Sequence, residues 1–155
     1  MSDLLVLDEW VWADFSGENQ IKNQAECFQF LEAVFKKCDR ILTVKGSSFA
    51  QKTFRHFKFS DTVRRKITVF YTAYFLHNSD KLVEIEETEL QPLPEELAKE
   101  VKSEDQYIVQ SFFAAKASII ITSDSPLLSV LEKNRIPCQL RDKYVPNYIA
   151  QHGRK

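Results

Sequence analysis

The sequence has little cysteine, and its three cysteines indicate neither a disulfide framework nor a metal site. Cys27, Cys38 and Cys138 include no pair at the spacing of zinc ligands or of a redox motif, and their number is odd. Reduced thiols in a cytoplasmic protein are the simplest expectation. The sequence also lacks a signal peptide and any apolar run long enough to span a membrane, so we expect a soluble protein without a membrane partner.

The chain also lacks a dominant charge, because its formal net charge is −1. Global charge therefore argues neither for nor against a nucleic-acid partner. The distribution is uneven: residues 45–66 hold seven basic residues and one acid, whereas residues 80–105 hold ten acids and three lysines. Two solvated helix faces are the simpler explanation of this asymmetry, and a functional role is the alternative.

Short apolar strands alternate with helices along the chain. The expected strands are residues 4–7, 40–44, 81–85, 119–121 and 137–140. The expected helices are residues 20–37, 46–57, 62–76, 95–102, 127–134 and 143–150, together with one that begins at Ser103 and ends before Ser118. This alternation predicts a three-layer α/β/α sandwich with a mainly parallel sheet. Because no repeat or linker interrupts residues 1–155, we expect a single domain.

One helix and the strand that follows it organise the rest of the sequence. Ser103 and Gln106 have the spacing of a capping box, which predicts the start of the helix. The run Ile119–Ile121 is too apolar for an edge strand and is typical of a parallel sheet covered on both faces. The first turn of the helix lies beside the carboxyl end of the strand. Asp105 and Asp124 should therefore meet at the edge where such sheets bind ligands.

The first strand ends in the same way, because Asp8 directly follows the apolar run Leu4–Leu7. Two parallel strands that each end in Asp place both carboxylates at one sheet edge, so Asp8, Asp105 and Asp124 are expected to converge. A helix cap would explain Asp8 or Asp124 singly, and the helix dipole would explain Asp105. Such separate roles explain less easily why three acids fall at converging positions.

Three converging carboxylates predict a cation site. Like charges at one edge repel each other, and proteins tolerate this when the groups share protons or bind a cation. A set of oxygen ligands without nearby His or Cys suits Mg²⁺ or Mn²⁺ better than zinc. Thr122 and Ser123 would supply further oxygen contacts. Such a metal would orient and deprotonate a water and neutralise charge on a phosphodiester.

At these positions the sequence resembles the PIN domain of metal-dependent ribonucleases. Three motifs carry the resemblance, in order: the strand ending in Asp8, the helix motif Asp105-Gln106-Tyr107-Ile108, and the strand ending Thr122-Ser123-Asp124. The resemblance implies an α/β/α sandwich, one or two divalent ions on catalytic Asp8, Asp105 and Asp124, and cleavage of single-stranded RNA. The family includes VapC-type toxins and RNA-processing nucleases, so an antitoxin or another protein is an expected partner, and a homodimer is also expected.

One acid of the PIN pattern is missing. PIN nucleases usually carry a further acid, often Glu, on the helix after the second strand, whereas this helix reads SSFAQKTFRHF. It contains Gln51, Lys52 and Arg55 but no acid. Glu32, one helix earlier, is a poor substitute because its neighbours indicate that it flanks a packed face, and Ser125 rather than an acid follows Asp124.

The missing acid leaves two main hypotheses open. The first is a metal-dependent ribonuclease with a three-carboxylate site. The second is a PIN-like scaffold that binds RNA or protein without cleaving. A phosphatase or receiver-like domain built on Asp8 is a weaker third, because Asp8-Glu9-Trp10 lacks a second Asp at a useful offset.

Basic and aromatic residues supply the expected contacts to partners. Five cations are expected to hold the RNA backbone through its phosphates: Lys45, Lys52, Arg55, Arg64 and Arg65. Trp10 and Trp12 would either stack on bases or belong to the core or an interface. Five aromatic residues are expected to supply a homodimer surface, or else to pack in the core: Trp10, Trp12, Phe54, Phe57 and Phe59.

Overall fold

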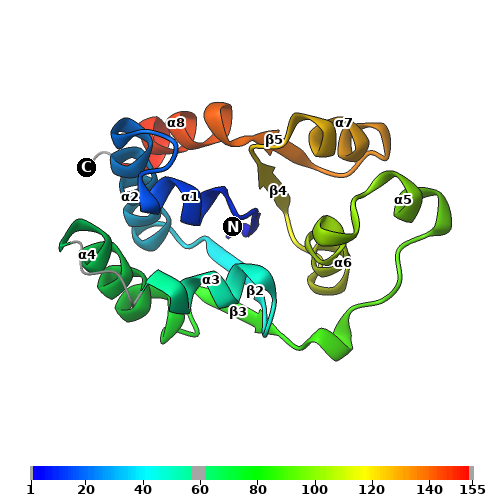
Figure 1. Ribbon diagram of the computed structural model, residues 1–155, viewed down its shortest axis with the longest axis horizontal. Helices are drawn as coiled ribbons and strands as arrows, with labels where there is room; N and C mark the ends of the chain where they lie inside the picture. The colour runs from blue at the N-terminus through cyan, green and yellow to red at the C-terminus, as the bar shows by residue number, and fades with distance from the viewer. Residues whose placement is uncertain (1, 57–61, 154–155) are drawn as a thin grey trace.

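The computed structural model describes residues 2–56 and 62–153, with side chains described for residues 2–52 and 65–153. In this part of the chain, five parallel strands form one sheet with the order β3-β2-β1-β4-β5 (Figure 1). The strands are β1 (Leu4–Leu7), β2 (Arg40–Val44), β3 (Leu82–Ile85), β4 (Ile119–Thr122) and β5 (Cys138–Leu140). The predicted α/β fold with a parallel sheet is therefore confirmed.

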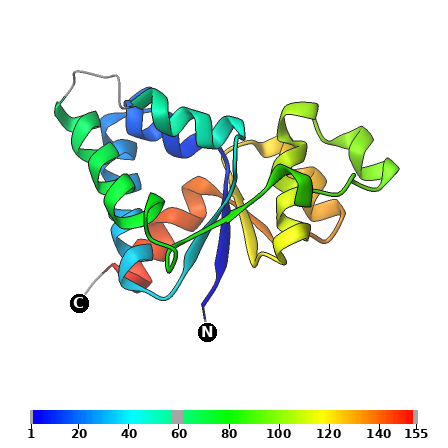
Figure 2. The ribbon, with the colours of Figure 1, turned by 90° about the horizontal axis from the view of Figure 1, so that it is seen from below.

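Helices cover both faces of this sheet, which gives the predicted three layers (Figure 2). One face carries α1 (Trp10–Ser16), α2 (Ile21–Lys36), α3 (Ser48–His56), α4 (Thr62–Tyr71) and α8 (Arg141–His152). The other carries α5 (Glu95–Glu100), α6 (Gln106–Ala115) and α7 (Ser125–Lys133). Shorter helical turns are η1 (Thr72–Leu76, a π-helix that continues α4), η2 (Glu87–Glu89) and η3 (Ser103–Asp105).

The central strand β1 is apolar throughout because each of its faces meets a separate hydrophobic cluster. In β1, Leu5 and Leu7 pack into the cluster beneath α1, α2 and α8, whereas Leu4 and Val6 pack beneath α5, α6 and α7. Successive side chains of a strand point to opposite faces, so a strand covered on both sides needs an apolar residue at every position. β1 therefore lies in the middle of the sheet, between β2 and β4.

No helix was predicted for the residues that form α1. All of its residues except Ala13 are buried, so no exposed polar face gives the helical periodicity on which sequence reasoning depends. Gly17 ends the helix in a left-handed conformation with φ of 80°, and its N–H reaches the carbonyls of Ala13 and Asp14. A residue with a Cβ is disfavoured in that conformation, which is why glycine stands there.

The two tryptophans of α1 are core residues, which confirms the core role expected for them and excludes the alternative of stacking on RNA bases. The Trp10 indole Nε1 donates to the Ile121 carbonyl at 2.9 Å. The Trp12 ring lies 5.1–5.6 Å, between centroids, from three other rings: Phe15, Phe49 and Tyr71. Neither tryptophan supplies an exposed homodimer surface. The side chains of Phe54, Phe57 and Phe59 lie outside the described residues.

Helix α6 begins three residues later than predicted, and the capping box predicted at Ser103 is wrong. Ser103 belongs to η3, and α6 begins at Gln106 with no side-chain cap. The Gln106 amide instead donates to the carbonyls of Ala98 and Val101, at 3.2 and 3.3 Å. Carbonyls at the end of a helix lack partners within it, so this amide satisfies the end of α5.

A buried ion-pair network joins α1, α2 and α8. The Arg141 side chain is only 3% exposed; its Nε donates to Asp14 at 2.9 Å, and its Nη1 donates to Glu26. Asp14 is fully buried and also accepts from the Asn19 amide. The guanidinium lies 5.6 Å from the centroid of the Trp10 ring. Because a charge buried this deeply persists only when it is paired, the network fixes α8 against α1.

The three cysteines lie within the described ranges and form no disulfide. Cys27 is buried, Cys38 is exposed and Cys138 is half-buried, and each is a free thiol. No helix among the described residues combines the length and the apolar character needed to cross a membrane.

Candidate functional site

Asp8 lies at the carboxyl end of β1 and is held by two hydrogen bonds. Its residue surface is 9% exposed. Its Oδ2 accepts from the Thr122 hydroxyl at 2.7 Å, and its Oδ1 accepts from the Glu9 N–H at 2.6 Å. Burial raises the pKa of the Asp8 carboxyl; these hydrogen bonds partly offset the rise, and the charges of Glu9 and Asp124 add to it. Asp8 is therefore a positioned carboxylate in an environment that disfavours its charge.

Asp124 lies at the carboxyl end of the neighbouring strand and begins α7. Its Oδ1 accepts from the Leu127 N–H at 3.2 Å, and Pro126 occupies the first turn, where a missing N–H costs nothing. The Asp124 N–H donates to the Thr122 hydroxyl oxygen at 3.0 Å. Thr122 thus links Asp8 to Asp124, and the oxygen contact to a metal predicted for it stays a prediction. Ser123 is exposed.

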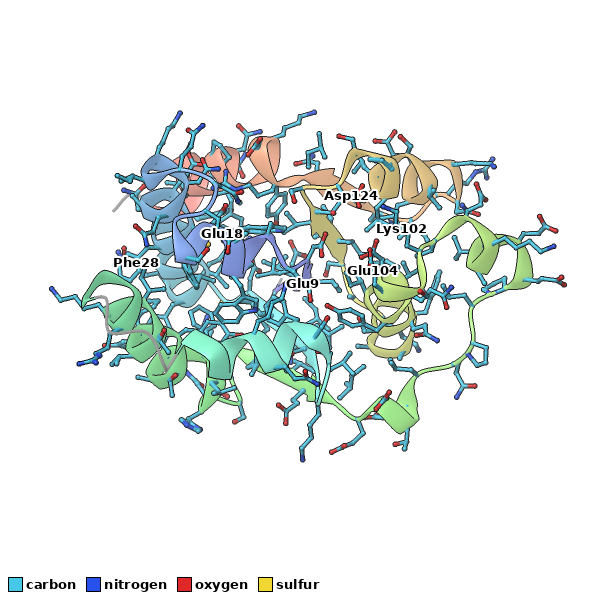
Figure 3. The ribbon with its side chains drawn as sticks, in the orientation of Figure 1. Glu9, Glu18, Phe28, Lys102, Glu104 and Asp124 are labelled. Atoms are coloured by element: carbon cyan, nitrogen blue, oxygen red, sulfur yellow. The ribbon has the colours of Figure 1, made fainter. Side chains whose placement is uncertain are left out.

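Asp105 completes the group from the helical layer that contains α6, at the position that precedes this helix. Burial raises the pKa of Asp105 to about 6, and the charges of Asp8, Asp124 and Glu104 act in the same direction. The three predicted carboxylates therefore share one edge of the sheet, close enough to affect one another. Figure 3 shows Asp124, Glu104 and Glu9 around the centre of the molecule in that view.

The donor set suits a hard divalent cation. Carboxylate oxygens are the ligands that Mg²⁺ and Mn²⁺ prefer. Within the described part of the chain, however, no three His, Cys, Asp or Glu side chains are grouped so that they could hold a metal ion as they stand. Asp8 and Asp124 instead accept hydrogen bonds from the protein. The residues fit a metal by their chemistry, and their metal-binding and catalytic roles stay predictions.

Glu9 is a fourth carboxylate at this edge, and sequence reasoning missed it. Its Oε2 lies 3.2 Å from the ammonium of Lys52, while its Oε1 is buried without a hydrogen-bond partner in the structure. Its charge contributes to the raised pKa of Asp8. The available signal was its position directly after Asp8.

Helix α3 presents a cation to the acids, not the further carboxylate of the PIN pattern. Lys52 reaches Glu9, whereas the exposed Gln51 turns back and donates to the Gly46 carbonyl at 3.0 Å. Glu32 lies elsewhere, in a groove between α2 and α8 that it shares with Lys36. Of the two lysines from this region predicted to hold RNA, Lys52 is paired with Glu9, and Lys45 lies 3.5 Å from Glu86.

The remaining cations predicted to bind RNA are less defined. Arg65 is exposed on α4. The side chains of Arg55 and Arg64 lie outside the described residues. Binding of RNA by this basic region stays a prediction.

A small pocket of about 70 Å³ opens beside two of the acids. Polar lining comes from Lys102, Asp105 and Asp124, together with Glu100. The apolar lining comes from Val101, Pro126, Leu127 and Val130. The pocket thus joins the acidic edge to the start of α6 and to α7.

Comparison with known proteins gave no match: no family model, curated protein or solved structure matched the chain. What is established is therefore the α/β fold with its all-parallel sheet and the chemistry of the residues at its carboxyl edge.

Asp105→Asn is expected to stabilise the metal-free protein at neutral pH. A carboxyl whose pKa is about 6 in the folded state and near 3.8 unfolded destabilises the fold once pH rises above that window. Removing it should raise the free energy of unfolding at pH 7.5 by about 1 kcal/mol, a figure discounted for solvent screening, and by nothing at pH 3.5.

Urea unfolding in EDTA at the two pH values measures this difference. Glu132→Gln, which removes an exposed acid of α7, is the control and should show no such pH-dependent gain. An Asp105→Asn protein that is less stable at pH 7.5 would indicate that Asp105 has a structural role instead.

Proposed function

We propose that the protein is a Mg²⁺- or Mn²⁺-dependent endoribonuclease that cleaves single-stranded RNA, with Asp8, Asp105 and Asp124 as its catalytic carboxylates. The observation that carries this proposal is the meeting of acids from β1, α6 and β4 at one sheet edge, where burial raises the pKa of Asp105 to about 6 and the charges of Asp8 and Asp124 add to the rise. The resemblance of the three motifs to the PIN family supports the same reaction. Glu9 would serve as the fourth acid in place of one on α3.

The roles of the individual residues follow from their hydrogen bonds. Thr122 donates to Asp8 and accepts from the Asp124 N–H, so one hydroxyl sets the relative position of the two strand-end acids. The Leu127 N–H orients the Asp124 carboxylate. When bound to these oxygens, a divalent ion would lower the pKa of a water and neutralise charge on the phosphodiester.

A binding scaffold without catalysis is the second candidate. The observation that favours it is the ion pair of Lys52 with Glu9, which places a fixed positive charge where a metal would otherwise be drawn. In this role the protein would bind RNA, or a protein partner such as an antitoxin, through the same edge. A cytoplasmic location and a homodimer both stay predictions.

A cleavage assay separates the two candidates. End-labelled single-stranded RNA is incubated with the protein in Mn²⁺, in Mg²⁺ and in EDTA. The nuclease proposal expects cleavage in either metal and none in EDTA. RNA that is bound but intact under all three conditions would reject the nuclease and leave the scaffold.

Lys52→Glu is expected to raise Mn²⁺ affinity about tenfold, because it exchanges a repelling cation for a ligand beside Glu9. Gln51→Glu is the matched control: its side chain is exposed and directed at Gly46, so affinity should change less than about twofold. Calorimetric titration with Mn²⁺ measures both. Equal effects of the two substitutions would mean that Lys52 does not control the site.

A further inference from the structure

Two lysines of the basic stretch 45–66 are each paired with a carboxylate of the same protein. Lys52 pairs with Glu9 at 3.2 Å, and Lys45 pairs with Glu86 at 3.5 Å. An exposed substrate anion would have to displace these carboxylates before it could use the lysines. The pairs therefore weaken both residues as binding sites for an RNA phosphate.

Lys102 differs from these lysines in both its partners and its position. It is exposed and makes no ion pair with any residue that the structure describes. Glu100 lines the same pocket and stands two residues before Lys102, but it already pairs with Lys133 at 2.9 Å. Lys102 also lines the pocket that contains Asp105 and Asp124. Figure 3 shows Lys102 near Asp124. Its positive charge lowers the pKa of Asp105, whereas the charges of the neighbouring acids raise it.

An anionic substrate needs such a residue at this edge. Carboxylates repel a phosphate, so the edge can hold a phosphodiester only where a cation offsets them. A lysine ammonium is a compact charge with three donors, and it contacts a phosphate without demanding a fixed orientation. Val101 and Leu127, which also line the pocket, are buried and apolar.

We propose that Lys102 binds a backbone phosphate of single-stranded RNA at the pocket beside Asp105 and Asp124. The strand then approaches the acids from the side of α5, η3 and α7. This inference rests on the proposed function, because it names the substrate contact of the same site. It assigns the main phosphate contact to a residue that the basic stretch 45–66 does not contain.

The test is the salt dependence of RNA binding. A fluorescent single-stranded 12-nucleotide RNA is titrated with the protein in EDTA, where cleavage is blocked, at several salt concentrations. Lys102→Gln should weaken binding about threefold to tenfold at low salt and reduce the slope of log K against log salt by about 0.7. Lys102→Arg should preserve the slope, because it keeps the charge.

Lys99→Gln is the matched control. It removes the same charge three residues earlier, but Lys99 pairs with Glu95 at 3.3 Å and does not line the pocket. The affinity of Lys99→Gln for RNA and the salt dependence of its binding should remain close to those of the parent. If Lys102→Gln leaves the slope unchanged while Lys45→Gln or Lys52→Gln lowers it, the inference is overturned.

Failure of the inference can be distinguished from failure of the proposed function. A parent protein that binds RNA as tightly as its Lys102→Gln variant rejects the inference alone. A slope change in Lys102→Gln without any metal-dependent cleavage supports the inference and favours the scaffold. A parent that neither binds nor cleaves RNA rejects both.

Discussion

Replacement of Asp8 by Asn is expected to reduce Mn²⁺-dependent cleavage of single-stranded RNA at least about a hundredfold, the effect of removing one preorganised group from an active site. The amide keeps one oxygen for the Glu9 N–H but removes the charge that a metal requires. Asp124→Asn should cause a similar loss of cleavage. It should leave α7 intact, since Asn caps a helix as well as Asp does. Initial rates on a labelled RNA measure the loss.

Glu32→Gln is the control for loss of an acid, because Glu32 lies in the groove between α2 and α8. Its rate should stay within about twofold of the parent. In EDTA the Asp8→Asn protein should melt no lower than the parent, since the substitution relieves repulsion with Glu9 and Asp124. A variant with normal cleavage, or one that cleaves poorly only because it is unfolded, would contradict the catalytic role.

Arg141→Met is expected to lower the free energy of unfolding by about 3–5 kcal/mol. The substitution leaves the fully buried Asp14 without its 2.9 Å partner, and burial of an uncompensated charge is strongly unfavourable. For a chain of this length the melting temperature should fall on the order of 10 °C. Urea unfolding followed by circular dichroism measures the change.

Two comparisons isolate the buried charge as the cause. Lys99→Met breaks an exposed pair with Glu95 and should cost less than about 1 kcal/mol. Adding Asp14→Asn to the Arg141→Met protein should recover part of the loss, because it removes the uncompensated charge. An Arg141→Met protein that unfolds within about 1 kcal/mol of the parent would show that the network does not stabilise α8 against α1.

The sheet and its three strand-edge acids could be predicted because they depend on short, local patterns. A run such as Ile119–Ile121 has no polar position, so both of its faces must be covered, and this is typical of a parallel sheet. Parallel strands all end at one edge, so acids that follow Leu7 and Thr122 share it. The convergence of Asp8 and Asp124 therefore follows from topology alone.

The rest of the site depends on contacts between distant residues. Glu9 and Lys52 are 43 residues apart, and nothing in either local sequence indicates that they pair. Helix α1, which begins directly after Glu9, could not be predicted from the sequence because nearly all of its residues are buried and no polar face shows its period. The local sequence gives no signal for Lys102, because its significance lies in the absence of a described ion-pair partner and in its place on the pocket wall.

Calorimetric titration with Mn²⁺ tests most directly whether the acids of β1, α6 and β4 form one cation site. The parent is expected to bind one ion per chain. Asp8→Asn and Asp105→Asn should each weaken binding at least about tenfold, and Glu32→Gln should not. Binding that is absent from the parent, or equally tight in the parent and Asp8→Asn, would contradict the metal site and the proposed nuclease.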